Sequence, residues 1–476
     1  MIRALLAAGA AAVLALPAGL AAQGTPAAGA RQLPPQVRRY VSVDAPVVAL
    51  VHARLIDGTG RAARDDQTVI VEGERIARVG PSASVAVPAG AQVVDLSGHT
   101  LMPGIVGMHN HMYYGGMQPM FGSYPRLFMA AGVTTIRTTG SVDSYGELNL
   151  KRMSEAGTAV SPTIVVTGPY LQGPTDWLRM TALDSPEAAR RMVRYWAEEG
   201  VTWFKAYTTI SRATLGAAID EAHRHGVKVT AHLCSVGFRE AVSLGIDNLE
   251  HGFLVNTEHY AGKKPDECPA APDSLVYGGV DINGESVQRT IREMVARKVP
   301  LTSTLAVMEL SSPSRIPNDP RVLDALHPDL RPNIETFFRT ARERDDAGAR
   351  AIFRKAMDFE RAFVKAGGLL AAGSDPCCVT AIAGFADQRN FELLVEAGFP
   401  AEDAVRIMTL NGAMVLGMQE RIGSVEPGKQ ADLVVLRGDP TKTAGDIRNV
   451  VTVFRRGVGY DSAKLLESVK GMVGYR

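Results

Sequence analysis

Short apolar stretches alternate with amphipathic segments over most of this chain. After Pro103 and Gly104, eight apolar stretches have the character of strands: residues 104–109, 133–138, 163–167, 202–207, 228–232, 248–251, 301–305 and 369–375. Segments with helical spacing separate most of them, at 185–199, 212–225, 285–297 and 346–366, and a last helix opens at Pro400. Such alternation is typical of an α/β fold with a parallel sheet. Eight repeats predict a (β/α)8 TIM-like barrel over residues 104–418.

A different pattern flanks this region on both sides. Residues 47–51, 68–71, 75–79 and 92–95 are short apolar or alternating stretches between turns such as Asp57-Gly58. Similar stretches return at 423–425, 433–436 and 450–455. We expect residues 47–103 and 419–460 to form one composite β-sandwich from both chain ends, and residues 461–476 to be a C-terminal tail.

The first residues have the pattern of a secretory signal. Arg3 precedes an uncharged run, and small residues follow at Ala21 and Ala22, which predicts a signal peptide over residues 1–22. An uncleaved membrane anchor is the alternative, but the run is short and Pro17 interrupts it. Residues 23–46 are predicted to be a flexible leader. We therefore expect a periplasmic or secreted protein with no membrane association after cleavage.

Composition narrows the choice of partners. The 476 residues carry 51 basic and 50 acidic side chains without a basic stripe, so nucleic acid is not an expected partner. Self-association into a homo-oligomer stays open. Four cysteines are too few for a disulfide framework. In an exported chain Cys268 could bridge to Cys377 or Cys378, and free, partly buried thiols are the alternative.

Residue types that bind metals gather at the predicted strand ends. His109 and His111 close the first barrel strand, and period-two alternation puts both imidazoles on one side. The other candidates lie at the ends of four later strands: Lys205, His232, His251 and Asp375. In a barrel these ends share one rim. Neutral imidazoles and a carboxylate suit zinc or a related divalent ion, so the sequence predicts a metal site.

Lys205 needs a chemical explanation at such a site. It shares a strand face with Trp203 and Tyr207, which we place toward the barrel lumen. A bare ammonium beside a divalent cation is strongly disfavoured. The amine must lose its proton, find an acidic partner, or become a carbamate that could bridge two metals. A lysine facing solvent on a loop is the alternative.

Several side chains are candidates for catalysis and substrate contact. Asp375 could bind metal and act as general base, returning the proton to the leaving group. Tyr207 and Tyr260 could polarise a scissile carbonyl or could merely line a loop. Arg137 could bind a substrate carboxylate in a bidentate manner or form a structural ion pair. The long connections 254–284 and 306–345 are the expected walls of the substrate pocket.

Six motifs together resemble the metal-dependent amidohydrolase superfamily. They are LMPGIVGMHNH at 101–111, WFK at 203–205, TAH at 230–232, LEHG at 249–252, AGSD at 372–375 and GSVEPGKQADLVVL at 423–436. Their order is most similar to the branch with imidazolonepropionase-like and Xaa-Pro dipeptidase-like members, and the lysine is similar to that of its dipeptidase and ochratoxin-type amidase enzymes. The resemblance implies a deformed barrel with a composite β-sandwich.

The resemblance also implies ligand roles. His109, His111 and Asp375 would hold one divalent ion, His232 and His251 would hold a second, and a carbamylated Lys205 would bridge the two, with Zn2+ as the expected metal. Gly107 and Thr138 depart from the pattern, since relatives often have Asp there. The segment AHLC also lacks the second histidine often seen after the position of His232.

These features predict an exported binuclear-metal amidohydrolase. It would cleave the C–N bond of a dipeptide, N-acyl amino acid or similar small amide by metal-activated hydroxide, with Asp375 as general acid/base. The first alternative is a mononuclear cyclic-amide hydrolase or deaminase in which Lys205 is a bystander. The second is a non-catalytic periplasmic binding protein, which Asp375 disfavours because binding alone needs no proton shuttle.

Overall fold

The predicted barrel contains eight strands that pair in parallel in chain order. The computed structural model describes residues 32–174 and 180–474, so the signal peptide predicted at 1–22 lies outside the described residues. The barrel strands are β7 (Ile105–Asn110), β10 (Val133–Thr138), β11 (Thr163–Val165), β12 (Trp203–Ala206), β13 (Lys228–Ala231), β14 (Asn248–Glu250), β15 (Leu301–Ser303) and β16 (Leu370–Ala372). Strands β7, β10 and β11 form one ladder and β12 to β16 another. Parallel bridges from Thr167 to Trp203 and from Leu171 to Ala206 join the two ladders.

The barrel closes where β16 meets β7. The backbone N–H groups of Ser374 and Asp375 both donate to the carbonyl oxygen of His109, at 3.0 and 2.9 Å. A Cβ atom at Gly373 would lie only 2.1 Å from the backbone nitrogen of His109, so this approach requires glycine. The seam therefore places Asp375 directly beside His109.

One principal helix follows each barrel strand in the described chain. These helices are α2 (Tyr124–Ala130), α3 (Ser144–Glu155), α4 (Pro186–Glu198), α5 (Arg212–Arg224), α6 (Phe238–Ser243), α8 (Glu285–Ala296), α12 (Ala347–Lys365) and α13 (Phe385–Glu396), with α14 (Ala401–Met408) and α15 (Leu410–Leu416) after them. Capping side chains and prolines in the first turn explain where several of these helices begin. Before α4, for example, the Ser185 hydroxyl accepts the Ala188 N–H at 3.3 Å, and Pro186 occupies the first turn.

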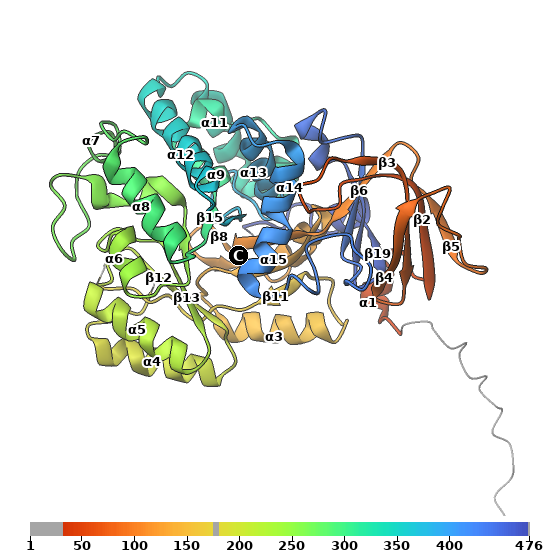
Figure 1. Ribbon diagram of the computed structural model, residues 1–476, viewed down its shortest axis with the longest axis horizontal. Coiled ribbons are helices and arrows are strands. Elements are labelled where there is room, and N and C mark those ends of the chain that lie inside the picture. Colours follow the sequence, from red (N-terminus) through yellow and green to blue (C-terminus); the bar gives the residue numbers. More distant parts are fainter. Residues whose placement is uncertain (1–31, 175–179, 475–476) are drawn as a thin grey trace, which may run out of the picture.

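Strands from both chain ends form one mixed sheet beside the barrel, at the right of Figure 1. Its order is β1 (Val41–Val43), β19 (Val458–Asp461), β18 (Val450–Arg455), β17 (Leu433–Arg437), β6 (His99–Pro103), β2 (Val47–Leu55), β3 (Arg64–Glu72) and β4 (Arg75–Pro81), with β5 (Gln92–Asp95) also paired to β2. The antiparallel pairing of β6 with β17 joins the two ends of the chain. Alternation along these strands buries Leu50, Leu101, Leu433 and Phe454 in one shared apolar core.

Three expectations about the flanking segments are wrong. Residues 423–425 form no strand, because Val425 N–H donates to the turn carbonyl of Asp57 at 2.9 Å instead of joining a ladder. Residues 32–46 are not a flexible leader: α1 (Pro35–Arg38) and β1 lie there, and Val37 is buried. The predicted C-terminal tail is not set apart from the domains over 461–474, since α16 (Ser462–Glu467) follows β19 and Val473 pairs with Leu326.

The two long connections after β14 and β15 are structured. The first holds η1 (Gly252–Val255), η2 (Thr257–His259) and α7 (Asp273–Val276); the second holds α9 (Leu305–Met308), η3 (Glu309–Ser311), η4 (Pro313–Arg315), α10 (Pro320–Ala325), η5 (Pro328–Leu330) and α11 (Arg331–Ala341). A small hairpin of β8 (Tyr113–Tyr114) and β9 (Gln118–Pro119) follows β7, and η6 (Ala444–Arg448) precedes β18. Within residues 32–174 and 180–474, no helix combines the length and hydrophobicity needed to cross a bilayer.

Candidate metal centre

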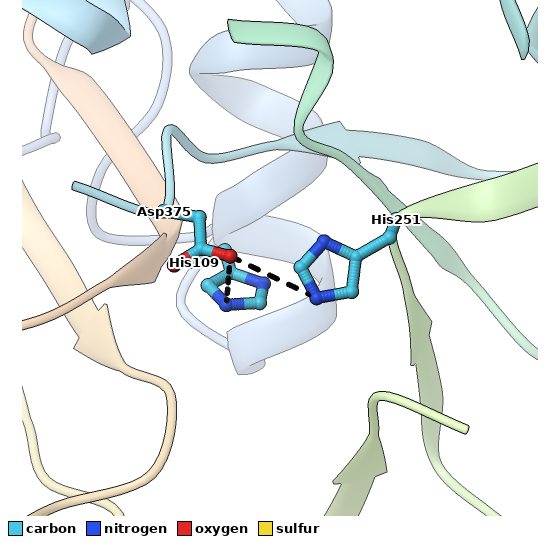
Figure 2. Close-up of side chains that lie close together, drawn as sticks. All are labelled: His109, His251 and Asp375. Carbon is cyan, nitrogen blue, oxygen red and sulfur yellow. Dashed lines mark ion pairs between the residues drawn. The ribbon is translucent and has the colours of Figure 1, made fainter. Parts of the chain in front are cut away.

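The side chains predicted at the strand ends meet at one rim of the barrel. The imidazole Nε2 of His111 lies 2.9 Å from Oδ1 of Asp375, and Nε2 of His109 and of His251 lie 3.6 and 3.9 Å from Oδ2 of Asp375. Figure 2 shows His109, His251 and Asp375 pointing toward one another from separate strands. One ligand atom from each of these three lies within 4.8 Å of the other two. This spacing is compatible with a single cation held between them.

The remaining two candidates lie beside this cluster. Nζ of Lys205 is 3.0 Å from Nε2 of His109, and the side chain is almost fully buried. The ring centroid of His232 is 4.4 Å from that of His251. The structure therefore brings all six predicted ligands together, with Lys205 on the lumen side of its strand as expected.

Two of these residues have a left-handed backbone. His251 has φ of 64° and Asp375 has φ of 49°, a region that residues other than glycine adopt at some cost and that is enriched at functional sites. Strict alternation would point Glu250 and His251 to opposite sides of the sheet. The turn at His251 lets both side chains face the lumen.

Glu250 was not predicted from the sequence, yet it orients His109. Its Oε2 lies 2.8 Å from Nδ1 of His109, while its Oε1 accepts hydrogen bonds from Arg137 and Asn248. Holding Nδ1 in this way directs Nε2 of His109 toward the rim. The available sign in the sequence was an acidic residue directly before the predicted ligand His251. Nδ1 of His251 is held similarly by the Thr304 hydroxyl, at 2.7 Å.

Burial sets the charge of the candidate ligands. It lowers the pKa of His109 to about 4 and that of His232 to about 3, with the nearby charge of Lys205 as the second cause. Burial alone would raise the pKa of Asp375, but the neighbouring His109 and His111 hold it well below its usual range. Neutral imidazoles therefore face an ionised carboxylate at neutral pH, as metal binding requires.

Unpartnered nitrogen atoms support a metal at this place. Nε2 of His251 and Nδ1 of His111 are buried and have no hydrogen-bond partner within the described part of the chain. A buried polar atom of this kind normally has a hydrogen-bond partner or binds an ion. Imidazole nitrogens with carboxylate oxygens suit zinc and related divalent ions, so the residues present fit the metal. The side chain of Asp375 is 15% exposed, whereas those of His109 and His251 are fully buried, and solvent therefore reaches the site at the carboxylate.

Arg137 cannot bind a substrate carboxylate in this structure, which corrects that prediction. Its guanidinium is fully buried, is paired with Glu250, and lies 4.5 Å from the ring centroid of Trp203. Because it packs inside the barrel beneath the rim, substrate does not reach it. The structural ion pair that the sequence left open is the arrangement observed.

The two predicted tyrosines differ in position. The ring centroid of Tyr207 lies 4.9 Å from that of His232 and 5.2 Å from that of Tyr170, so Tyr207 lines the centre. Tyr260 instead lines a surface hollow together with Arg212 and Arg289. The catalytic role considered for Tyr260 therefore stays a prediction, and lining a loop, the other arrangement that the sequence left open, is what this hollow shows. Tyr113, not predicted, stacks on His111 with ring centroids 4.5 Å apart.

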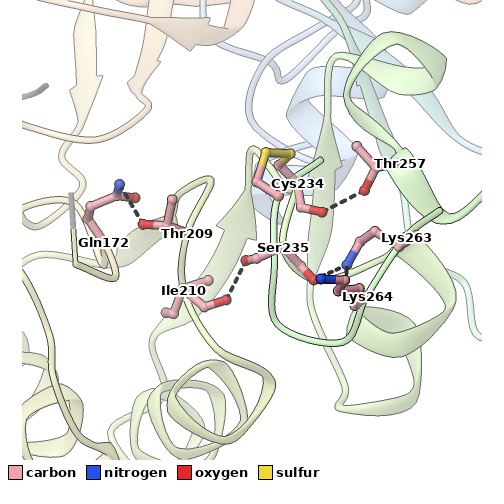
Figure 3. The surroundings of a disulfide bond; sticks show 9 residues. Gln172, Thr209, Ile210, Cys234, Ser235, Thr257, Lys263 and Lys264 are labelled. Carbon is pink, nitrogen blue, oxygen red and sulfur yellow. Dashed lines mark hydrogen bonds between the residues drawn. A yellow bond between two sulfur atoms is a disulfide. The ribbon is translucent and has the colours of Figure 1, made fainter. Parts of the chain in front are cut away.

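Cys268 pairs with Cys234, and not with Cys377 or Cys378, the two partners that the sequence left possible. The two Cα atoms are 5.0 Å apart and the bridge spans 34 positions of sequence. Figure 3 shows this bridge, with Cys234 O accepting from the Thr257 hydroxyl nearby. The disulfide ties the connection after β14 to the segment that carries His232. It also removes Cys234 as a thiolate ligand.

Comparison with known proteins agrees with this geometry. The model of the amidohydrolase family matches residues 100–459, and this chain belongs to that family. A provisionally assigned prolidase from Bifidobacterium longum is 25% identical, with a TM-score of 0.65 over 89% of this chain and 98% of that chain. A Xaa-Pro dipeptidase with bound methionine is 19% identical, with a TM-score of 0.64 over 87% of this chain and all of the other. These likenesses confirm the predicted barrel fold.

A curated relative matches over a shorter stretch. The imidazolonepropionase of Arthrobacter sp. (strain FB24) is 34% identical over 95 residues, which are 19% of this chain and 22% of that protein. The chain thus matches about a fifth of the length of that relative.

Proposed function

We propose that this chain is an exported, metal-dependent hydrolase with two metal ions that cleaves the amide C–N bond of a dipeptide, an N-acyl amino acid or a similar small molecule. The observation that carries the proposal is the meeting of four histidines, Lys205 and Asp375 at one barrel rim. The names of the relatives, a prolidase, a Xaa-Pro dipeptidase and an imidazolonepropionase, support C–N bond hydrolysis.

The chain offers ligands for two ions, which we propose to be Zn2+. His109, His111 and Asp375 would hold one, and His232 and His251 the other. Burial lowers the pKa of Lys205 to about 8, so a useful fraction of the amine is neutral near pH 8 and able to take up carbon dioxide as the bridging carbamate. When bound, such ions act as Lewis acids and generate a nucleophile from water at neutral pH.

Asp375 is the proposed proton carrier. Its carboxylate is partly exposed and is ionised at neutral pH, since the imidazoles hold its pKa low. It can accept a proton on the face where substrate enters and deliver it to the departing amine. Tyr207 borders this space and is the proposed contact for the carbonyl-bearing part of the substrate.

The disulfide supports the proposed export. Bridges such as Cys234–Cys268 form and persist in oxidising compartments. We therefore keep a periplasmic or secreted location as the proposal.

A second candidate is a mononuclear cyclic-amide hydrolase or deaminase. The compact cluster of His109, His251 and Asp375 favours it, because three ligands suffice for one catalytic ion. In that case Lys205 would be a bystander.

Metal analysis and a substrate panel test the proposal. We expect two equivalents of divalent metal and turnover of small amides, reduced about 10²- to 10⁴-fold in Asp375→Asn. Lys205→Ala should lose one equivalent and recover activity with short carboxylic acids, whereas one equivalent and an active Lys205→Ala protein would support the mononuclear candidate. Metal-replete protein that turns over no amide or ester would contradict both.

A further inference from the structure

Two adjacent cysteines occupy the loop that follows Asp375. Sγ of Cys377 and Sγ of Cys378 lie 2.6 Å apart as free thiols in contact, a separation longer than the roughly 2.05 Å of a disulfide bond. Both residues are partly exposed, so a small molecule can reach them, and neither takes part in the Cys234–Cys268 bridge. The proposed hydrolysis uses neither thiol.

The backbone of this loop is attached to the hairpin after β7. The Gly115 N–H donates to the carbonyl oxygen of Cys377 at 2.9 Å, and the Tyr114 hydroxyl donates to that of Val379 at 2.8 Å. These bonds hold the cysteine pair against residues 113–115. A movement of the pair is therefore transmitted to the hairpin.

The same loop and hairpin carry parts of the candidate metal centre. Asp375 lies two residues before Cys377, and Tyr113 stacks on His111. A change of conformation at 377–378 would therefore move the Asp375 carboxylate through the backbone that joins them. It would also move His111 through the hairpin that carries Tyr113. Cys377 and Cys378 are the described cysteines that the structure leaves outside its disulfide.

We propose that Cys377 and Cys378 form a reversible disulfide that controls this loop. The oxidant is a small-molecule disulfide: the S–H bonds of Cys377 and Cys378 and the S–S bond of the oxidant break, the Cys377–Cys378 S–S bond forms, and the two electrons and two protons leave on the oxidant as two thiols. Reduction by the reverse exchange restores the dithiol.

The short spacing of adjacent residues makes a disulfide between them easy to reduce. Consecutive Cα atoms are about 3.8 Å apart, less than the roughly 4.4–6.8 Å usual across a disulfide. Bonds outside the usual geometry are more easily reduced and are typical of regulatory disulfides. The closed ring fixes residues 377–378 and with them the placement of Asp375, so the oxidised protein is the more active form.

Mass spectrometry tests the bond itself, independently of any hydrolytic activity. The full chain is equilibrated with glutathione and glutathione disulfide, alkylated without reduction and digested with trypsin; the peptide 366–389 contains both cysteines and no other. We expect it to become unalkylated and lighter by two hydrogen atoms as the disulfide fraction rises. A peptide that stays doubly alkylated, or carries glutathione, at every ratio overturns the proposal.

Measurements of turnover test whether the disulfide regulates activity, and this second experiment rests on the proposed function. Oxidised wild-type protein should have a several-fold higher kcat/KM than protein equilibrated at a glutathione ratio that reduces the 377–378 pair and leaves the Cys234–Cys268 bridge intact. The matched control is the Cys377→Ser/Cys378→Ser double variant, which keeps the Cys234–Cys268 bridge and should show no such difference. Equal turnover of the two wild-type forms overturns the proposal that the disulfide regulates activity. A response of the same size in the double variant overturns it as well. A protein inactive in both forms counts against the hydrolase instead, while the peptide mass still decides the bond.

Discussion

Glu250 holds Nδ1 of His109 and the guanidinium of Arg137 in the same buried space. Burial acts to raise the pKa of this carboxyl, but Arg137 and His109 outweigh it and keep the group ionised. A single side chain thereby sets the orientation of a candidate ligand and balances a buried charge.

Replacing Glu250 by Gln should weaken both functions. Losing a charged partner of a metal ligand typically costs 10- to 100-fold in metal affinity. Leaving Arg137 buried without its counter-charge should cost about 3–5 kcal/mol of unfolding free energy. Metal titration and urea unfolding measure the two effects.

A double variant separates these effects. Arg137→Met together with Glu250→Gln removes the unpaired charge, so we expect much of the stability to return while metal affinity stays low. If affinity returned with stability, Glu250 would have a purely structural role.

Glu360 should make the stability of the protein depend on pH. It lies on α12, fully buried, with Oε2 unpartnered, and burial raises its pKa to about 8 from an ordinary 4.5. Between these two values the folded state keeps a proton that the unfolded state releases, so the unfolding free energy falls as pH rises through this window. The unfolding free energy falls by about 1.4 kcal/mol for each pH unit in this window. Glu360→Gln should therefore flatten the slope and be the more stable protein at pH 8.

Unfolding midpoints in denaturant at pH 5 and pH 8 measure the change. Asp358→Asn, at an exposed position of the same helix, is the control and should leave the slope unchanged. An identical slope in wild type and Glu360→Gln would contradict the prediction.

At the scale of elements, sequence reasoning succeeded where periodicity and length act together. The strands at 133–138 and 228–231 and the helix α4 lie within one or two residues of their predicted bounds. The connections were not predictable, because their short helices depend on tertiary contacts. For the same reason the partner of Cys268 could not be identified without the fold.

The connection after β14 should depend on its disulfide. Cys268→Ser opens a bridge between positions 34 residues apart and should cost about 2–4 kcal/mol of unfolding free energy. Lys263, whose ammonium now donates to the carbonyl of Ser235 at 2.6 Å, should become an early site of tryptic cleavage. Thermal unfolding and limited proteolysis without reductant measure these effects, and reduced wild type should behave like the variant.

At the scale of the whole molecule, the sheet built from both chain ends should couple the two parts of the protein. Phe454→Ala in the core of that sheet should cost about 3–5 kcal/mol. Because β6 leads directly into β7 while β17 follows the last barrel helices, the barrel should unfold with the sheet rather than after it.

Two optical probes check this coupling. All three tryptophans of the sequence lie between positions 104 and 418 and none lies in the strands of the flanking sheet, so fluorescence does not report directly on that sheet. Circular dichroism reports on both parts. We expect coincident transitions shifted together by the variant, and a separate early dichroism transition would show that the parts unfold independently.

The overall architecture was predictable because the flanking strands share one composition and the barrel strands recur eight times. The position of Arg137 was not, because the sequence places its side chain on a strand without telling how deep in the lumen it lies. That depth follows from the contacts of its guanidinium with Glu250 and with the ring of Trp203.

The pairing of β6 with β17 also fixes an order of events during synthesis. The early strand leaves the ribosome long before its neighbour exists, and most of the chain must be translated in between. Its exposed edge must meanwhile be shielded from other chains, as unpaired strand edges attract partners. The molecule can therefore be finished only when its last strands arrive, and a chain released early would leave the first ones without a place to dock.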